Sequence, residues 1–266
     1  MQDKPALCFE EQKILVYRTG SGFSEETVPI VQETSLRILL NDAEIVKIAC
    51  NANYPEELAV GFLQAEGFVT GASDIRKIEI SDDGRCVHVL TNDNIPKIEG
   101  RPHAPDTIES SGAKGWRGKG VSPHREDLST RKVFITPNSV FDLMERFVET
   151  SRLHQVTGGT HSAALSDGEH LLAVREDIGR HNTIDMLNGY ALLNGIDCSD
   201  KIILRTGRIS AEIVHKAWSL GIPMMISLSV PTSMAVQLCR KAGMTLIGSV
   251  RGEKMNIYCH EWRIKR

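Results

Sequence analysis

The second half of the chain alternates short apolar segments with longer apolar patterns of helical spacing, and this alternation constrains the fold most strongly. We expect strands at 161–167, 170–177, 201–207, 223–229 and 245–252, with a further extended segment at 255–260. We expect helices at 182–195, 210–221 and 233–243. Repeated β–α units are typical of a sheet covered by helices. The pattern predicts an α/β domain whose sheet is largely parallel after an opening hairpin around Asp167-Gly168.

One more helix is predicted at the start of this domain. In TPNSVFDLMERFVETSRLHQVTGG, Thr136 is a suitable cap and Pro137 suits the first helical turn. Apolar residues recur at helical spacing, and Gly158-Gly159 marks the end of the helix. We place the domain at 132–266.

The first part of the chain predicts a smaller α+β domain over 1–97. Two apolar segments meet at Asn41-Asp42, and two more flank Asp82-Asp83-Gly84, which are both hairpin patterns. Between them lies YPEELAVGFLQAEGFV, where Pro55 opens a helix and Gly67 ends it. The order is ββαββ-like.

Residues 98–131 join the two domains and have a different composition. They are rich in Gly, Pro, Ser and basic residues and show no apolar period. A segment of this length without regular structure is either a functional loop or a linker. We expect a mobile loop, whose basic residues Lys114, Arg117 and Lys119 could steer an anion.

Composition excludes several classes of protein. The net charge of −3 gives no general case for nucleic-acid binding. No apolar run is long enough to cross a bilayer, and the first residues lack the pattern of a signal peptide, so we expect a cytoplasmic protein. The six cysteines are scattered and form no CxxC, which is unlike a disulfide framework or a zinc knuckle.

Polar residues follow the predicted strands at the same end. In open α/β sheets, ligands bind beyond the carboxyl ends of the strands, near helix N-termini. Arginine forks and free N–H groups there favour a phosphorylated ligand. The residues expected to collect at this rim are Arg175, Arg180, Arg205, Arg208, His161, Asp177, His181, Asn182, Ser227, Ser229, Thr232 and Ser233.

Each of these residues also has a structural explanation. Asp177, Asn182 and Ser210 are placed to cap helices. Arg175 and Glu176 could form a solvated ion pair of little energetic value. His161 and His181 could each be an ordinary residue beside a strand or helix. The repetition of polar residues after successive strands favours a site over these separate explanations.

Five segments resemble those of one family: TGGTHSAAL, REDIGRHNTID, RTGRISAEIVHKA, GIPMMISLSVPTSMAVQL and MNIY. Together with EELAVGFLQAEG in the first domain, they resemble the FdhD/NarQ family of formate dehydrogenase accessory proteins. The resemblance covers nearly the whole chain, and its motifs are long and irregular.

The resemblance implies a cytidine-deaminase-like αβα fold for the second domain. It implies a homodimeric cytoplasmic sulfur carrier that receives sulfur from a cysteine desulfurase as a persulfide. The sulfur passes to the molybdenum bis(molybdopterin guanine dinucleotide) cofactor of formate dehydrogenase, and guanine nucleotides mimic that cofactor. The C-terminal segment that corresponds to cofactor contacts is Met255, Asn256, Ile257, Tyr258, Cys259 and His260.

The deaminase-like fold raises zinc deamination as a rival function. Zinc deaminases require an HxE motif followed by PCxxC. Here His161 is followed by Ser162 and Ala163, and no PCxxC is present. The ligand set for zinc is therefore missing, and we expect no metal site.

The sequence departs from the family at its persulfide motif. Members of the family carry a stretch like SSCGxCG, whereas this chain has ESSGAKG, with Ser111 and Lys114 at the two cysteine positions. Neither side chain can form a persulfide, since a thiolate is the sulfur nucleophile. Three explanations remain: a cofactor-binding chaperone without sulfur transfer, a substitute thiol for which Cys259 is the best candidate, or direct delivery of sulfur by the desulfurase.

Overall fold

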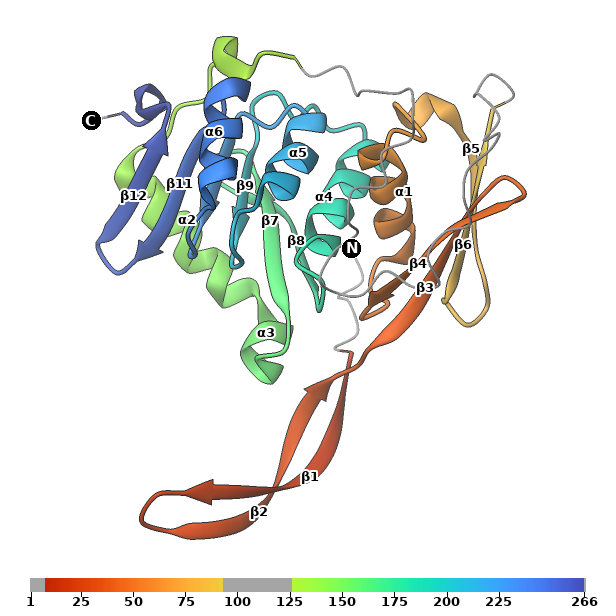
Figure 1. Ribbon diagram of the computed structural model, residues 1–266, viewed down its shortest axis with the longest axis vertical. Coiled ribbons are helices and arrows are strands. Elements are labelled where there is room, and N and C mark those ends of the chain that lie inside the picture. Colours follow the sequence, from red (N-terminus) through yellow and green to blue (C-terminus); the bar gives the residue numbers. More distant parts are fainter. Residues whose placement is uncertain (1–7, 93–125, 266) are drawn as a thin grey trace.

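The computed structural model describes residues 8–92 and 126–265 of the 266-residue chain. The described residues form an α+β domain, a larger α/β domain and a two-stranded arm (Figure 1). The predicted combination of a mixed-sheet domain with a smaller α+β domain is confirmed.

The larger domain is built on a mixed six-stranded sheet of order β12-β11-β10-β9-β7-β8. Its strands are β7 (His161–Ser166), β8 (Leu171–Asp177), β9 (Ile202–Arg205), β10 (Met224–Ser227), β11 (Thr245–Arg251) and β12 (Lys254–Cys259). Only the β9–β10 and β10–β11 pairs are parallel. The remaining pairs are antiparallel, so parallel pairing is confined to the three central strands.

Helices cover both faces of this sheet (Figure 1). One face packs against α4 (Asn182–Leu193), α5 (Ala211–Ser219) and α6 (Ser233–Ala242) through a buried apolar cluster that includes Ile184, Ile213 and Cys239. The other face packs against α2 (Pro137–Thr150) through Leu143 and Phe147. Strands that are buried on both faces explain the nearly continuous apolar runs of the sequence.

The single helix expected from Thr136 to Gly158 is two helices in the structure. The first is α2, which Thr136 caps by accepting from the backbone N–H of Ser139 at 3.1 Å. The second is α3 (Arg152–Thr157), and the break falls at Ser151. The Ser151 hydroxyl donates to the Phe147 carbonyl at 2.9 Å, which competes with continued helical bonding.

The smaller domain has a four-stranded sheet of order β4-β3-β6-β5. Its elements are β3 (Thr34–Leu40), β4 (Ala43–Cys50), α1 (Pro55–Ala65), β5 (Ile75–Ile80) and β6 (Cys86–Thr91). Both predicted hairpins form, and Asn41 adopts the left-handed conformation that its tight turn requires, with φ of 51°. β3 also pairs in parallel with β6, which joins the two hairpins into one sheet.

The two domains meet where α1 crosses α4 (Figure 1). The crossing is close because each helix presents a glycine at the contact. A Cβ on Gly61 would lie 1.7 Å from the Asp185 carbonyl oxygen, and one on Gly189 would lie 1.9 Å from the Glu57 carbonyl oxygen. No side chain fits between these backbones, so the glycines set the distance between the domains.

A two-stranded arm precedes the smaller domain. It consists of β1 (Phe9–Arg18) and β2 (Gly22–Val31), which pair with each other and with no other described strand. The arm projects away from both domains (Figure 1). Its root is fixed at Val31, which lies against Gly159 of the larger domain.

Candidate functional site

A pocket of about 570 Å³ lies at the end of the larger sheet where the parallel strands finish. Its walls come from the ends of α2 and α3, the loop before β7, the loops after β8, β9 and β10, and the last residue of β11. Such a crevice beyond the carboxyl ends of parallel strands is where the sequence predicted a ligand. The lining residues are Val148, Ser151, His154, Gly158, Gly159, Thr160, His161, Arg180, Thr206, Gly207, Arg208, Leu228, Ser229 and Arg251.

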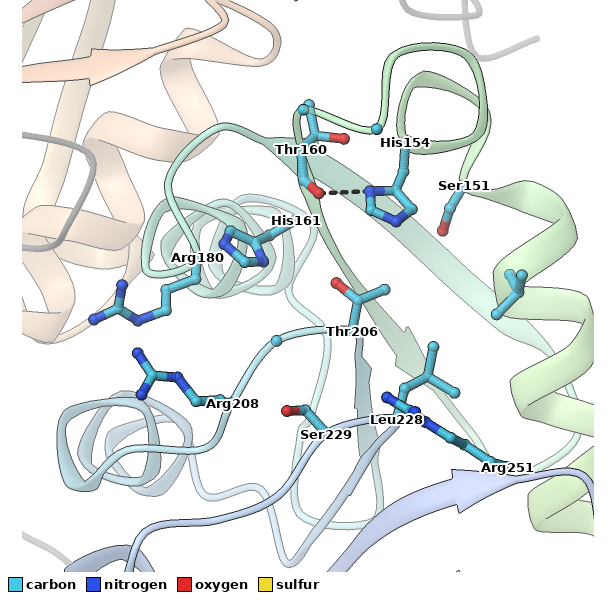
Figure 2. Close-up of a pocket in the computed structure, with 14 residues that line it drawn as sticks. Ser151, His154, Thr160, His161, Arg180, Thr206, Arg208, Leu228, Ser229 and Arg251 are labelled. Carbon is cyan, nitrogen blue, oxygen red and sulfur yellow. Dashed lines mark hydrogen bonds between the residues drawn. The ribbon is translucent and has the colours of Figure 1, made fainter. Parts of the chain in front are cut away.

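The pocket is lined by cationic groups (Figure 2). Arg180 and Arg208 extend in the same direction at one end of the view, and Arg251 lies at the opposite end. His161 is on the wall between the loops that carry Arg180 and Thr206. Burial, together with the charges of nearby Arg205 and Arg180, lowers the pKa of His161 below its ordinary value. A local excess of positive charge favours an anionic ligand.

Arg205 is buried next to the pocket without lining it, and it is the most unusual cation of this region. It ends β9 and is only 1% exposed, and no carboxylate of the described residues forms an ion pair with it. Its Nε donates to the Gly207 carbonyl at 3.1 Å, while its Nη1 has no hydrogen-bond partner in the part of the chain described here. Burial lowers the pKa of Arg205 to about 9. An unpaired buried cation is costly, and an anion beside it would offset that cost.

Gly207 keeps the space beside Arg205 open. A Cβ at this position would lie 3.1 Å from Arg205 Nη2 and 3.2 Å from His161 Nδ1. The glycine has no left-handed backbone conformation to explain it. Its lack of a side chain instead leaves room between a buried guanidinium and an imidazole, next to the pocket that Gly207 lines.

Glu176 supports the pocket wall without entering the pocket. Its carboxylate accepts from the backbone N–H groups of Leu153 and His154, at 3.0 and 2.8 Å, and from the Ser162 hydroxyl at 3.2 Å. A carboxylate at a helix N-terminus satisfies free N–H groups of the first turn. His154 then contacts the Thr160 carbonyl through Nδ1 at 2.6 Å (Figure 2). These contacts fix α3 and the loop 158–160 against the sheet.

Arg175 and Glu176 do not form the solvated ion pair that the sequence suggested. Arg175 is buried, and its Nη2 donates to Glu57 Oε1 of α1 at 2.7 Å. Its guanidinium also lies 3.8 Å from the centroid of the Tyr54 ring. The two side chains point to opposite faces of β8, as neighbours in a strand must. Arg175 therefore joins the two domains and does not line the pocket.

Asp177 and Asn182 likewise face the smaller domain. Asp177 is fully buried and accepts from the backbone N–H groups of Asn51 and Gly179, at 2.8 and 2.7 Å, and from Asn182 Nδ2 at 2.6 Å. Asn182 Nδ2 also donates to the Ala49 carbonyl at 2.9 Å. Burial raises the pKa of Asp177 to about 6. This network fixes the loop that carries Arg180, but neither side chain lines the pocket.

His181 lies behind the pocket at the start of α4. It is 4% exposed, and its Nε2 is 3.1 Å from Glu212 Oε2 without hydrogen-bond geometry. Burial, with the charges of Lys216 and Arg180, lowers the pKa of His181 to about 3. The imidazole is therefore neutral in this structure at physiological pH.

The remaining predicted residues are divided between the pocket and its surroundings. Ser229 lines the pocket, and the Ser227 hydroxyl donates to the Gly207 carbonyl at 3.0 Å. Thr232 caps α6 by accepting from the Ala235 N–H at 3.2 Å, and Ser233 is the first residue of that helix. The segment Met255, Asn256, Ile257, Tyr258, Cys259 and His260 lies along and just after edge strand β12, outside the pocket lining.

The thiol of Cys259 is in the core. The residue is 7% exposed, belongs to the apolar cluster beneath α6, and donates to the Met244 carbonyl at 3.5 Å. This is a position typical of a structural thiol rather than of a sulfur carrier. Ser111 and Lys114 lie outside the described residues, as do Arg117 and Lys119.

Sequence reasoning missed several residues of the pocket. Arg251 is the last residue of β11, at the same end of the sheet as Arg208 after β9, so the rule that located the rim also applied to it. Gly207, Ser151 and His154 had no such indication, because their roles depend on loops that fold together only in three dimensions. Within residues 8–92 and 126–265, no three His, Cys, Asp or Glu side chains are placed to hold a metal ion. No described helix is long and apolar enough to span a membrane.

Comparisons with known proteins agree with this architecture. The model of the FdhD/NarQ family matches residues 31–265. The chain is 35% identical to the sulfur carrier protein FdhD of Bacillus pumilus, over 93% of this chain and 94% of that protein. It is 36% identical to the protein of the same name from Bacillus subtilis, over 89% and 90%.

A solved structure shows the same fold. The crystal structure of a formate dehydrogenase accessory protein from Desulfotalea psychrophila superposes with a TM-score of 0.78. The match covers 97% of this chain and 100% of that one at 25% sequence identity. With a family match that spans both domains and relatives aligned over nearly their full length, this chain belongs to the FdhD/NarQ family.

Proposed function

We propose that this protein is a cytoplasmic maturation factor for formate dehydrogenase that binds the molybdenum bis(molybdopterin guanine dinucleotide) cofactor. The relatives named as sulfur carriers and the accessory-protein fold support this function. In it, a cysteine desulfurase supplies sulfur, the cofactor receives it, and formate dehydrogenase receives the cofactor. The cofactor is cargo for this protein, and guanosine diphosphate is a suitable mimic of its nucleotide portion.

The residues of the pocket fit an anionic nucleotide. The single observation that carries the proposal is Arg205, a buried guanidinium that has no carboxylate partner among the described residues and lies beside Gly207 of the pocket wall. A phosphate group at that position would accept from the guanidinium in a charge-assisted bond. Arg180 and Arg208 would hold further phosphate oxygens, since both arginines line the same pocket.

His161 is suited to respond to the ligand. Burial lowers its pKa, as do nearby cations, and a bound anion would oppose the effect of the cations by stabilising the imidazolium. The chain thereby contributes a group that gains a proton when the anion enters. The walls formed by α3 and the loop 158–160 would exclude water from one side of the nucleotide.

Gly207→Ala tests the position of the ligand. We expect calorimetry to show guanosine diphosphate binding at least about tenfold more weakly to this variant, because the added methyl group occupies the space between Arg205 and His161. Gly71→Ala is the matched control, since its Cβ would meet nothing closer than the Ser73 hydroxyl at 3.7 Å. Equal affinity of both variants and the wild type would remove Gly207 from the binding site.

A second function, cofactor binding without sulfur transfer, is favoured by the placement of the thiols. All six cysteines are described by the structure, and none lines the pocket. Four are buried, and burial raises the pKa values of Cys50 and Cys198 to about 12. A buried thiol that stays protonated is a poor acceptor of sulfur. The absence of cysteine at positions 111 and 114 also favours cofactor binding without sulfur transfer.

Intact-mass measurement after incubation with cysteine and an active cysteine desulfurase separates these two functions. For the cofactor-binding function, we expect no reducible mass increase of one sulfur atom, because four of the six thiols are buried and none lines the pocket. A relative that carries the paired loop cysteines serves as the positive control. A reducible adduct that maps to one cysteine would instead establish this chain as a sulfur carrier.

A further inference from the structure

Two thiols meet at one edge of the larger domain, outside the lining of the pocket. Cys239 is in the last turn of α6, and Cys259 ends edge strand β12. α6 packs against β11 and β12 (Figure 1), and both cysteines belong to the apolar cluster beneath this helix. The proposed function uses neither thiol, so their proximity requires a separate explanation.

Met244 brings the two sulfur atoms together. The Cys239 thiol donates to Met244 Sδ at 3.8 Å, and the Cys259 thiol donates to the Met244 carbonyl at 3.5 Å. The Met244 backbone N–H in turn donates to the Cys239 carbonyl at 3.0 Å. The two thiols are also hydrogen-bonded to each other. A disulfide requires two cysteines that approach closely, and these contacts meet that requirement.

The two thiols differ in acidity. The hydrogen bond from Cys239 lowers the pKa of Cys259 below its ordinary value although burial opposes it, and the Leu246 backbone N–H and Arg240 also favour the thiolate. The same hydrogen bond, together with burial, raises the pKa of Cys239. Because the thiolate is the reactive form, Cys259 is the first of the pair to react, and Cys239 keeps its proton until the second step.

Cys259 is also the more accessible of the two thiols. It is 7% exposed, whereas Cys239 is fully buried. β12 lies at the edge of its sheet, and among the described residues it pairs with β11 alone. So small an exposed area admits a hydroperoxide and excludes a bulky protein thiol. A thiol with a lowered pKa beside a second, resolving cysteine is typical of redox-sensitive sites.

We propose that Cys239 and Cys259 are a redox pair already in place in this fold, in which Cys259 reacts with hydrogen peroxide and Cys239 completes a disulfide between α6 and β12. The Cys259 thiolate attacks one peroxide oxygen, the O–O bond breaks, and the sulfur becomes a sulfenic acid. The departing hydroxide takes up the proton that Cys259 lost. Cys239 then attacks the Cys259 sulfur, and its proton leaves with the sulfenic hydroxyl as water. Two thiols are thereby oxidised by two electrons, and one peroxide is reduced to two water molecules.

The first test uses the wild-type full chain. The protein is treated with hydrogen peroxide, and its remaining thiols are then alkylated in denaturant. We expect four alkylated cysteines of the six, and a cross-linked peptide that joins Cys239 to Cys259 and is lost on reduction. Six alkylated cysteines, or a cross-link between other cysteines, would overturn the proposal. No step uses guanosine diphosphate or formate dehydrogenase, so the result is independent of the proposed function.

Two single variants test the roles of the two thiols. In Cys239→Ser, we expect no cross-link and a sulfenic acid on Cys259 that dimedone traps as a mass adduct. In Cys259→Ser, we expect neither a cross-link nor an adduct at Cys239. Cys198→Ser is the matched control and should cross-link like the wild type, since Cys198 is buried in the same cluster but its thiol donates to the Ile196 carbonyl. A dimedone adduct on Cys239 would overturn the assigned order of reaction.

The melting temperature tests whether the pair is already in place. We expect the oxidised wild type to unfold about 5 °C or more above the reduced protein, because the cross-link restricts the unfolded chain. Circular dichroism follows both transitions, and this experiment does not depend on the folding of any variant. A lower melting temperature of the oxidised form would mean that the bond distorts α6 or β12, which would overturn the claim of a pair already in place.

Discussion

Replacing Gly189 by alanine is expected to lower the free energy of unfolding by about 3 kcal/mol, the upper end of the range for an overpacked core. The added Cβ would lie 1.9 Å from the Glu57 carbonyl oxygen and 2.6 Å from its carbon, so α1 and α4 must move apart. Backbone atoms cannot rotate away as a flexible side chain can. The separation would also strain the Glu57–Arg175 pair, which crosses the same junction.

The sign of this effect is informative, because alanine is ordinarily the better helix former. In an exposed helix, glycine to alanine gains about 1 kcal/mol. Thermal or urea unfolding should therefore show destabilisation of Gly189→Ala, with a melting temperature lower by roughly 10 °C for a chain of this size. Gly71→Ala again serves as the control. A variant as stable as the wild type would mean that the two helices are not in backbone contact.

Replacing Arg205 by methionine is expected to affect binding and stability in opposite directions. The guanidinium is buried without a carboxylate partner among the described residues, so an apolar side chain of similar length should leave the free energy of unfolding unchanged or raise it. Affinity for guanosine diphosphate should fall about 100-fold, since removal of one partner from a desolvated charge pair costs about 2–5 kcal/mol.

Arg208→Met is the matched comparison for this experiment. Arg208 lines the pocket, next to which Arg205 is buried, and it is exposed, so solvent screens its charge and the loss of affinity should be several times smaller. Unfolding curves and binding isotherms on the same preparations would show both effects. If Arg205→Met lowers stability and affinity together, the arginine has a structural role and the anion site must be placed elsewhere.

The order of strands and helices was predictable because apolar residues recur at different spacings in the two kinds of element. Turn residues mark the boundaries between the elements. Asn41 and Gly168 mark hairpins that form as expected, and both have positive φ values. The helix break at Ser151 was not predictable, because the apolar period continues through Leu153, which is also buried. The deciding contact is Glu176, which satisfies the N-terminus of α3 from a strand more than 20 residues away.

The candidate site was also predictable only in part from the sequence. The rule that ligands bind beyond the ends of parallel strands located the rim, and Arg180, Arg208, His161 and Ser229 line the pocket found there. The rule could not separate Arg175, near the end of β8, from Arg205, at the end of β9, because the two strands have similar apolar sequences. Only Arg175 meets a carboxylate, and that carboxylate is Glu57, 118 residues away.

The sequence by itself determined the α/β alternation, the edge of the sheet where polar residues gather, and the loss of the paired cysteines at Ser111 and Lys114. These properties depend on local spacing or on residue identity. The tertiary structure alone decided that Arg175 has a carboxylate partner, that Arg205 is buried without one among the described residues, and that Cys259 is in the core. Charge pairing and burial depend on segments that are distant in the chain and meet only in the folded protein, and the residue pattern within one element carries no information about such partners.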